Sequence, residues 1–195
     1  MDINSTKLNI LELYTSNYLA QYHIREIAKL LKKNHTTLLP HINSLIKNNI
    51  LISKTIGKNK ILTLNFNILT KNYLLLTETN KTNHYLIQNF QIKKIIIEIF
   101  KLNLEGTIVL FGSYAKKTFN KDSDIDLFYL GETKQLNKIK EIGKIYGKTI
   151  NIKTSTQKNF NPKDHLITEI IKYHILLHNP QPFIDLLWKY YEERR

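Results

Sequence analysis

The chain has 195 residues, of which 42% are hydrophobic and 10% aromatic, and its formal net charge at pH 7 is +13. This length and composition predict a globular protein of one medium or two small domains, and the lack of cysteine excludes disulfides and thiolate metal sites. The sequence has no run of about 18 apolar residues and no signal-peptide pattern at its start, so we expect a cytoplasmic protein without a membrane partner.

The positive charge is concentrated in the first half of the chain. Residues 1–104 hold 14 Lys and Arg against 5 Asp and Glu, a net charge of +9, whereas residues 105–195 hold 15 against 11, a net charge of +4. A basic surface attracts anionic partners, and nucleic acid is the usual one. The chain is also dense in Lys, Asn and Ile, a bias that AT-rich coding can produce, so many of these lysines are also consistent with a plain solvated surface.

The first seventy residues have the pattern of three helices followed by a β-hairpin. Apolar residues recur at helical spacing in three segments, residues 6–17, 22–34 and 35–49. Residues 50–65 alternate apolar and polar side chains on both sides of a Gly-containing turn, as a hairpin does. In the third helix we expect Thr37 to be the N-cap, because the amide that Pro40 lacks is then one of the unpaired donors of the first turn.

This order of elements resembles a winged helix-turn-helix domain, which we expect over residues 1–70. The resemblance implies that the third helix enters the major groove of double-stranded DNA while the hairpin lies near the backbone. The side chains placed to contact DNA are then Thr36, His41, Asn43, Lys47, Lys58 and Lys60. Winged domains also serve as dimerisation or protein-docking modules, and the net charge favours DNA over these alternatives.

Residues 71–104 are expected to form a connecting helical region. A short helix and a connector are predicted in residues 68–85, followed by a strongly apolar helix that ends near Gly106. One face of this second helix carries four isoleucines at helical spacing, Ile92, Ile95, Ile96 and Ile99.

The remainder, residues 105–195, alternates strands and helices, which is typical of a small α/β (α+β) domain around a mixed sheet. Strands are predicted at residues 107–111, 124–130 and 148–155. Helices are predicted at residues 133–147, 162–179 and 180–193. His174 and His178 would lie four residues apart on the second of these helices, where a surface pair is favoured over a metal site because no third ligand is near in sequence.

Two aspartates one residue apart lie in the apolar run SDIDLFYL. Side chains alternate along a strand, so Asp124 and Asp126 face the same side and repel each other unless a cation lies between them or both face water. Gly112 and Ser113 form a turn after the preceding strand, where backbone amides suit a phosphate, and Lys116 can add positive charge. Paired carboxylates beside a phosphate suit Mg²⁺, and two such ions can stabilise both the attacking and the leaving oxygen.

The arrangement G-S-x10-D-x-D resembles the signature of the DNA polymerase beta nucleotidyltransferase superfamily, and its form here is similar to the minimal nucleotidyltransferase branch over about residues 105–178. The resemblance implies transfer of a nucleoside monophosphate from a nucleoside triphosphate to an acceptor, with release of pyrophosphate. It also implies that Asp124 and Asp126 are catalytic and bind one or two magnesium ions. The nucleotide-binding residues that it implies are Gly112, Ser113 and Lys116.

The chain departs from this family pattern at two positions. After Lys116 the family usually has Gly, whereas this chain has Lys117. The family also has a third carboxylate on a later strand, and the matching residue here is Asn151, whose amide is neutral and cannot act as a base. Loss of an acid–base group costs about 10²–10⁴-fold in rate, and Asp164 or Glu169 could replace it only if the following helix brings one of them close.

These departures leave two functions open. The first is a magnesium-dependent nucleotidyltransferase with a DNA-binding domain. The second is a DNA-binding transcriptional regulator whose transferase domain is catalytically weakened and senses nucleotide. By family analogy alone, a protein acceptor or a separate toxin chain is a further partner of either.

Overall fold

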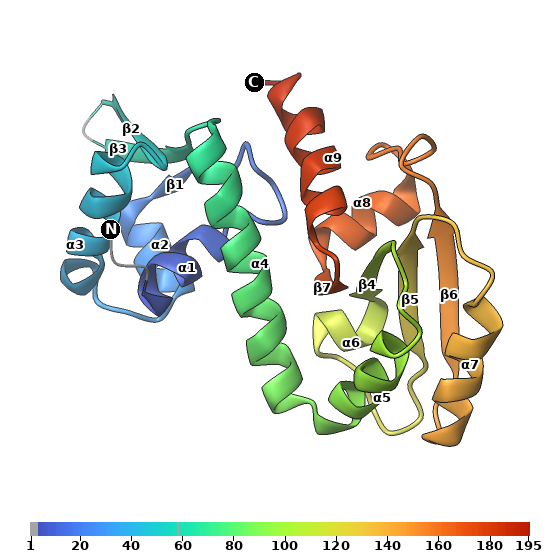
Figure 1. Cartoon of the computed structure of the whole chain (residues 1–195). Coiled ribbons are helices and arrows are strands. Elements are labelled where there is room, and N and C mark those ends of the chain that lie inside the picture. The colour runs from blue at the N-terminus through green and yellow to red at the C-terminus, as the bar shows by residue number, and fades with distance from the viewer. Residues whose placement is uncertain (1–3, 58) are drawn as a thin grey trace. The chain divides into compact units, whose positions relative to one another are not determined.

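The computed structural model describes residues 4–57 and 59–195, and these form two compact units (Figure 1). One unit contains the residues up to Glu78 together with Trp188–Arg195, and the other contains Thr79–Leu187. Each has its own β-sheet, so the described chain combines helices with an antiparallel and a mixed sheet. The division into residues 1–70, 71–104 and 105–195 stays a prediction about domains. No helix in the described ranges is both long and apolar enough to cross a membrane.

The first unit contains the three helices and the hairpin that the sequence predicts. Its elements in chain order are α1 (Ser5–Glu12), β1 (Tyr22–His23), α2 (Ile24–Leu30), α3 (His35–Lys47), β2 (Leu51–Ile56) and β3 (Asn59–Leu64). The strands pair antiparallel in the order β1-β3-β2. Strand β1 was not predicted, because two residues are too short to show an alternating pattern. The winged helix-turn-helix family of this unit stays a prediction.

Helix α3 begins earlier than expected. Its N-cap is Asn34, whose side-chain oxygen accepts a hydrogen bond from the Thr36 amide at 3.1 Å. The prediction that Thr37 is the N-cap is therefore wrong, and Pro40 lies inside the helix. Thr36 and Pro40 are both exposed, so water can bind the Thr36 carbonyl oxygen that Pro40 cannot satisfy.

A single long helix replaces the predicted short helix and connector of residues 68–85. Helix α4 (Ile68–Gln88) has 21 residues, because no Gly or Pro interrupts this stretch. Helix α5 (Phe90–Phe100) follows at once and ends before the predicted position near Gly106. The predicted isoleucine face of α5 is confirmed, since the residues of this helix that are buried are Ile92, Ile95, Ile96 and Ile99.

The second unit is built on a four-stranded mixed sheet. Its strands are β4 (Thr107–Phe111), β5 (Ile125–Leu130), β6 (Ile150–Ser155) and β7 (Ile175–His178). They lie in the order β6-β5-β4-β7, with β5 and β6 parallel and the other neighbours antiparallel. The remaining helices are α6 (Gly112–Lys116), α7 (Leu136–Ile145), α8 (His165–Lys172) and α9 (Gln181–Glu192).

The predicted helix over residues 162–179 is wrong in its second half. Helix α8 ends at Lys172, and the chain then forms β7, which pairs with β4. A continuous apolar run does not distinguish a helix from a buried strand, so the pattern could not show this change. The predicted histidine pair is also wrong: His174 is buried beside the Ile171 carbonyl at 2.8 Å, and His178 lies on β7, 2.7 Å from the Leu104 carbonyl.

One face of the mixed sheet is buried against α5 and α7. The core there contains Ile125, Leu127 and Tyr129 of β5 together with Ile150 of β6 and the isoleucine face of α5. Because side chains alternate along a strand, this burial directs the residues between them to the opposite face. On that face the pairing register places Asp126 between Phe111 of β4 and Asn151 of β6.

Candidate functional site

The two aspartates lie where β5 begins. Asp126 is the second residue of the strand and is half-buried, and Asp124 directly precedes the strand and is exposed. The buried Ile125 between them points into the core on the other face. The two carboxylates therefore share one face of the sheet, as strand alternation requires.

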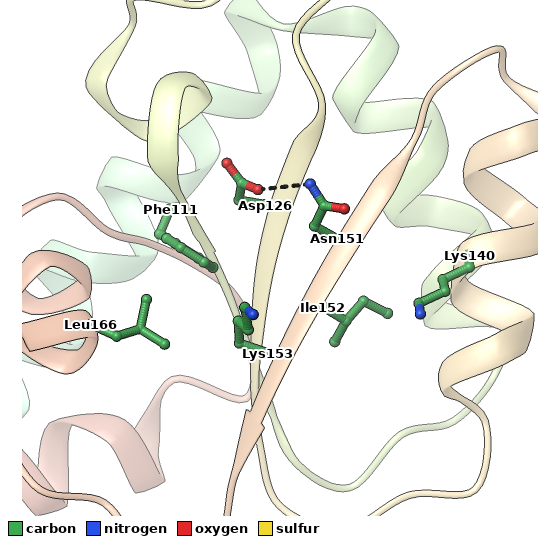
Figure 2. Close-up of a pocket in the computed structure, with 7 residues that line it drawn as sticks. All are labelled: Phe111, Asp126, Lys140, Asn151, Ile152, Lys153 and Leu166. Atoms are coloured by element: carbon green, nitrogen blue, oxygen red, sulfur yellow. Dashed lines mark hydrogen bonds between the residues drawn. The ribbon is translucent and has the colours of Figure 1, made fainter. Parts of the chain in front are cut away.

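The side-chain amide of Asn151 bridges the two aspartates. Its Nδ2 donates to Asp124 Oδ2 at 3.3 Å and to Asp126 Oδ1 at 3.2 Å, and Figure 2 shows the second of these hydrogen bonds. The parallel register, in which Asp126 faces Asn151, brings the three side chains together. An amide has two N–H donors and no charge, so it can satisfy one oxygen of each carboxylate without adding a third negative charge.

The turn at Gly112 lies directly against Asp126. Gly112 has φ +67, and a Cβ at this position would collide with the Asp126 carboxylate. Glycine is therefore favoured here for its backbone conformation, and any side chain at this position requires Asp126 to shift. Ser113 follows in the short helix α6, so the predicted phosphate turn and the aspartate pair are neighbours in the fold.

The end of α6 explains one of the departures in sequence. Lys117 is the C-cap of α6 and has φ 59 and ψ 30, a left-handed conformation. Such a conformation costs a residue with a Cβ roughly 1–2 kcal/mol, and glycine adopts it freely. The turn therefore keeps the backbone shape that glycine favours although a lysine occupies it.

Lys116 points to α8 rather than to the aspartates. Its Nζ lies 2.9 Å from Glu169 Oε2 and 5.0 Å from the centre of the Tyr173 ring. The hydrogen bond with Glu169 raises the pKa of Lys116 and lowers the pKa of Glu169. Because both side chains are exposed, this pair is screened by solvent and contributes little to stability.

Neither acid of α8 takes the place of the missing third carboxylate. Asp164 caps the helix and accepts from the Leu166 amide at 2.8 Å, and Glu169 is paired with Lys116. Within residues 4–57 and 59–195, no group of three or more His, Cys, Asp or Glu side chains gathers in a way that could hold a metal ion. The residue that joins Asp124 and Asp126 is Asn151.

The side chains of Asp124, Asp126 and Asn151 fit a magnesium site in which Asn151 is the weakest of the three ligands. Two carboxylates provide the hard, charged oxygens that Mg²⁺ prefers, and the ion usually completes its shell with water and substrate phosphate. The amide nitrogen of Asn151 faces the carboxylates, so its carbonyl oxygen could join such an ion only after the amide turns. Asp124 and Asp126 are therefore the residues that would hold the metal.

A cavity of about 380 Å³ opens beside Asp126 and Asn151 (Figure 2). Its lining residues are Phe111, Asp126, Lys140, Asn151, Ile152, Lys153 and Leu166. The sequence reasoning missed Lys140 and Lys153. Strand alternation could have identified Lys153, which is two residues after Asn151 and on the same face of β6, whereas Lys140 lies on α7 and depends on packing that the sequence does not reveal.

In the first unit, three of the predicted DNA-contacting side chains share one exposed face of α3. Thr36, Asn43 and Lys47 are exposed, and their spacing at 100° per residue aligns them along the helix. His41 is half-buried, with its ring 3.3 Å from the Asn4 amide nitrogen. Lys60 is exposed on β3, and Lys58 lies outside the described residues. The DNA-binding roles of all these residues stay predictions.

Comparison with protein families matches residues 91–178 to the nucleotidyltransferase domain. The matched segment runs from α5 to β7 and includes Gly112, both aspartates and Asn151. No match was found among curated proteins or among solved structures. Residues 91–178 of the second unit thus match a nucleotidyltransferase domain, which suggests nucleotidyl transfer and leaves the acceptor, the metal and the role of the first unit to be proposed.

The requirement for glycine beside Asp126 can be tested by comparing it with a second glycine of similar φ that has no atom close to it. Gly147 has φ +68 and open space around it, so Gly147→Ala adds only backbone strain, about 1–2 kcal/mol. Gly112→Ala adds the same strain and also forces Asp126 to move, for which overpacking costs suggest about 1–3 kcal/mol more. Urea unfolding of both variants measures the difference, and equal losses would contradict the close approach.

The bridging role of Asn151 can be tested by restoring the third acid. Asn151→Asp should destabilise the metal-free chain, because three carboxylates then repel one another, and should bind Mg²⁺ about tenfold more tightly or better. Urea unfolding in a chelator and during a Mg²⁺ titration measures both effects. Asn72→Asp, which adds the same charge on an exposed residue of the first unit, is the control. If both variants respond alike to Mg²⁺, Asn151 does not belong to the cation site.

Proposed function

We propose that this chain is a magnesium-dependent nucleotidyltransferase, which moves a nucleoside monophosphate from a nucleoside triphosphate to an acceptor, and that its N-terminal winged helix binds DNA. One observation carries the transferase part. Asp124 and Asp126 share one face of the sheet, linked by Asn151, and the carboxylate of Asp126 leaves no room for a side chain at Gly112. The carboxylates and the turn that we propose binds phosphate are thereby neighbours in the fold.

Each residue of the site has a role that follows from its chemistry. Asp124 and Asp126 hold the divalent ion, which neutralises phosphate charge and orients the triphosphate when it is bound. The amide and hydroxyl groups of Gly112 and Ser113 donate hydrogen bonds to phosphate oxygens. Phosphoryl-type transfer needs little more than such positioning and charge neutralisation, so a small site on a rigid sheet is sufficient.

Lys116 requires a change of partner to act on the nucleotide. In the structure it pairs with Glu169, and an exposed pair of this kind is weak. A phosphate group near Ser113, three residues earlier in α6, carries more negative charge than one carboxylate and can compete for the lysine. We therefore propose that Lys116 binds the nucleotide by leaving its ion pair with Glu169 and contacting a phosphate group instead.

The neutral Asn151 sets a limit on the rate. It cannot accept the proton of the acceptor hydroxyl, so that proton must leave to water or to an aspartate oxygen. General-base contributions are about 10²–10⁴-fold, and we expect transfer slower by a factor in this range than with three acids. The proposed transferase is thus a slow one.

The regulator is the second candidate, and two observations favour it. The neutral Asn151 amide donates to one oxygen of each carboxylate and cannot act as a base, which disfavours transfer but not nucleotide binding. The exposed face of α3 carries polar and basic side chains, Thr36, Asn43 and Lys47, of the types that contact bases and phosphates. In this function nucleotide binding changes the affinity for DNA, and no nucleotide is transferred.

Labelled nucleoside triphosphates test the proposed transfer. With Mg²⁺ and a lysate that supplies DNA, RNA and protein acceptors, the native chain should label an acceptor. Asp124→Asn combined with Asp126→Asn should lower the labelling at least about 100-fold, because both metal-binding carboxylates are lost. Asp122→Asn removes an exposed carboxylate two residues before Asp124 and should leave the labelling close to native. No labelling at all, or labelling that the double variant retains, would refute the transferase.

Binding to duplex DNA tests the role of α3. Lys47→Gln should weaken binding and lower the slope of log affinity against log salt concentration by about one, because one phosphate contact is lost. Lys29→Gln removes an exposed lysine of α2 and should change neither quantity. Fluorescence anisotropy at several salt concentrations measures both, and identical behaviour of the two variants would exclude α3 as the DNA-contacting helix.

A further inference from the structure

Two lysines line the cavity beside the aspartate pair, and neither is used in the proposed transfer. Lys153 lies on β6 and Lys140 on α7, and both are exposed. Within the described ranges neither has an acidic partner, in contrast to Lys116 and Lys101, which pair with Glu169 and Glu98. Two ammonium groups without counter-ions at the wall of one cavity attract an anion.

The position of Lys153 links these lysines to the aspartates. Asn151 and Lys153 are two residues apart on β6 and face the same side of the sheet as Asp126. Alternate residues of a strand are about 6.5 Å apart, a distance that a lysine side chain can span. A ligand that meets the aspartate site is therefore within reach of the Lys153 ammonium group.

The remaining wall of the cavity is apolar. Phe111, Ile152 and Leu166 line it, and Figure 2 shows Lys140 extending from α7 beside Ile152. Strand β6 is at the edge of the sheet. Asn151 and Lys153 face one side of this strand and Ile152 faces the other, so the cavity is lined from both sides of the sheet edge. Its volume of about 380 Å³ lies within the range of small-molecule sites, which combine apolar walls with a few polar groups.

An apolar wall, two lysines without an acidic partner among the described residues and the Asp126 carboxylate suit one class of ligand. A nucleotide unit has a flat base and a sugar for the apolar wall, and a phosphate for the lysines. We propose that this cavity binds a phosphate-bearing nucleotide unit, with Lys153 and Lys140 as its phosphate-binding residues. The inference rests on the proposed function, since it extends the same site. The phosphate belongs either to the nucleoside triphosphate or to a nucleic-acid strand that presents its 3′ end as the acceptor.

Paired lysine variants of the full chain test this inference. The cavity variant is Lys140→Gln with Lys153→Gln. The control is Lys138→Gln with Lys144→Gln, which removes two exposed lysines of α7 that do not line the cavity. Dissociation constants are measured in Mg²⁺ for a nucleoside triphosphate and for a single-stranded tetranucleotide with a free 3′ hydroxyl, which is too short to form a duplex for the winged helix.

The cavity variant should bind at least one of the two ligands roughly tenfold more weakly, because charge-assisted contacts to phosphate are lost, while the control changes less than about twofold. A loss confined to the triphosphate identifies the incoming nucleotide as the source of the phosphate, and a loss confined to the tetranucleotide identifies an acceptor strand. If the native chain binds a ligand and both variants bind it equally, the inference is overturned while the proposed transfer stands. If the native chain binds neither ligand, the inference is overturned as well, and the labelling experiment decides the transfer independently.

Discussion

Repulsion between Asp124 and Asp126 is the constraint around which the second unit is organised. Two carboxylates on one face of a strand are unfavourable unless something compensates their charge. In this structure the Asn151 amide donates one N–H to each of them. It compensates them only in part, because hydrogen bonds from a neutral donor leave the net charge of the pair unchanged. We propose that the remaining charge of the pair attracts a divalent cation, and with it the phosphate groups that such a cation would bring.

The fold makes this arrangement rigid. The core on the other face of the sheet holds β5 and β6 in register through Ile125, Leu127 and Ile150. This register places Asn151 beside Asp126, and the antiparallel register with β4 places Phe111, the residue before the Gly112 turn, on the other side. A slip of one residue in either pairing would turn the functional side chains to the wrong face. The site thus depends on apolar packing on the opposite face of the sheet.

Local pattern was sufficient to predict much of this site. The shared face of the aspartates follows from strand alternation, and the turn at Gly112 follows from a glycine directly after an apolar strand, but the nearness of Asp126 to this glycine does not follow from the sequence. The residues that neighbouring strands and helices bring to the site were harder to predict from the sequence. Asn151 was identified through a family resemblance, but its hydrogen bonds to both aspartates depend on the register of β5 and β6. Lys140 needed the packing of α7 as well, and no local pattern contains that information.

The errors in the predicted helices and strands also arise where the local pattern of residues does not determine the structure. Residues 170–177 are mostly apolar, so helix and buried strand could not be told apart there, and β7 with His178 was assigned to a helix, together with His174 just before it. In the first unit, Asn34 and Thr37 are both good helix caps, and the structure uses the earlier one. The long α4 was missed because its polar and apolar residues do not form a clean stripe, although nothing in its sequence interrupts a helix.

The central claim is that the aspartate pair binds a nucleotide through a divalent cation. Calorimetric titration of the full chain with a non-hydrolysable nucleoside triphosphate, once in Mg²⁺ and once in a chelator, tests it most directly. The account predicts binding in Mg²⁺ and loss of at least about 100-fold in affinity in the chelator, because two carboxylates whose negative charge is not neutralised then face the triphosphate. Equal affinity under the two conditions, or no binding under either, would contradict it.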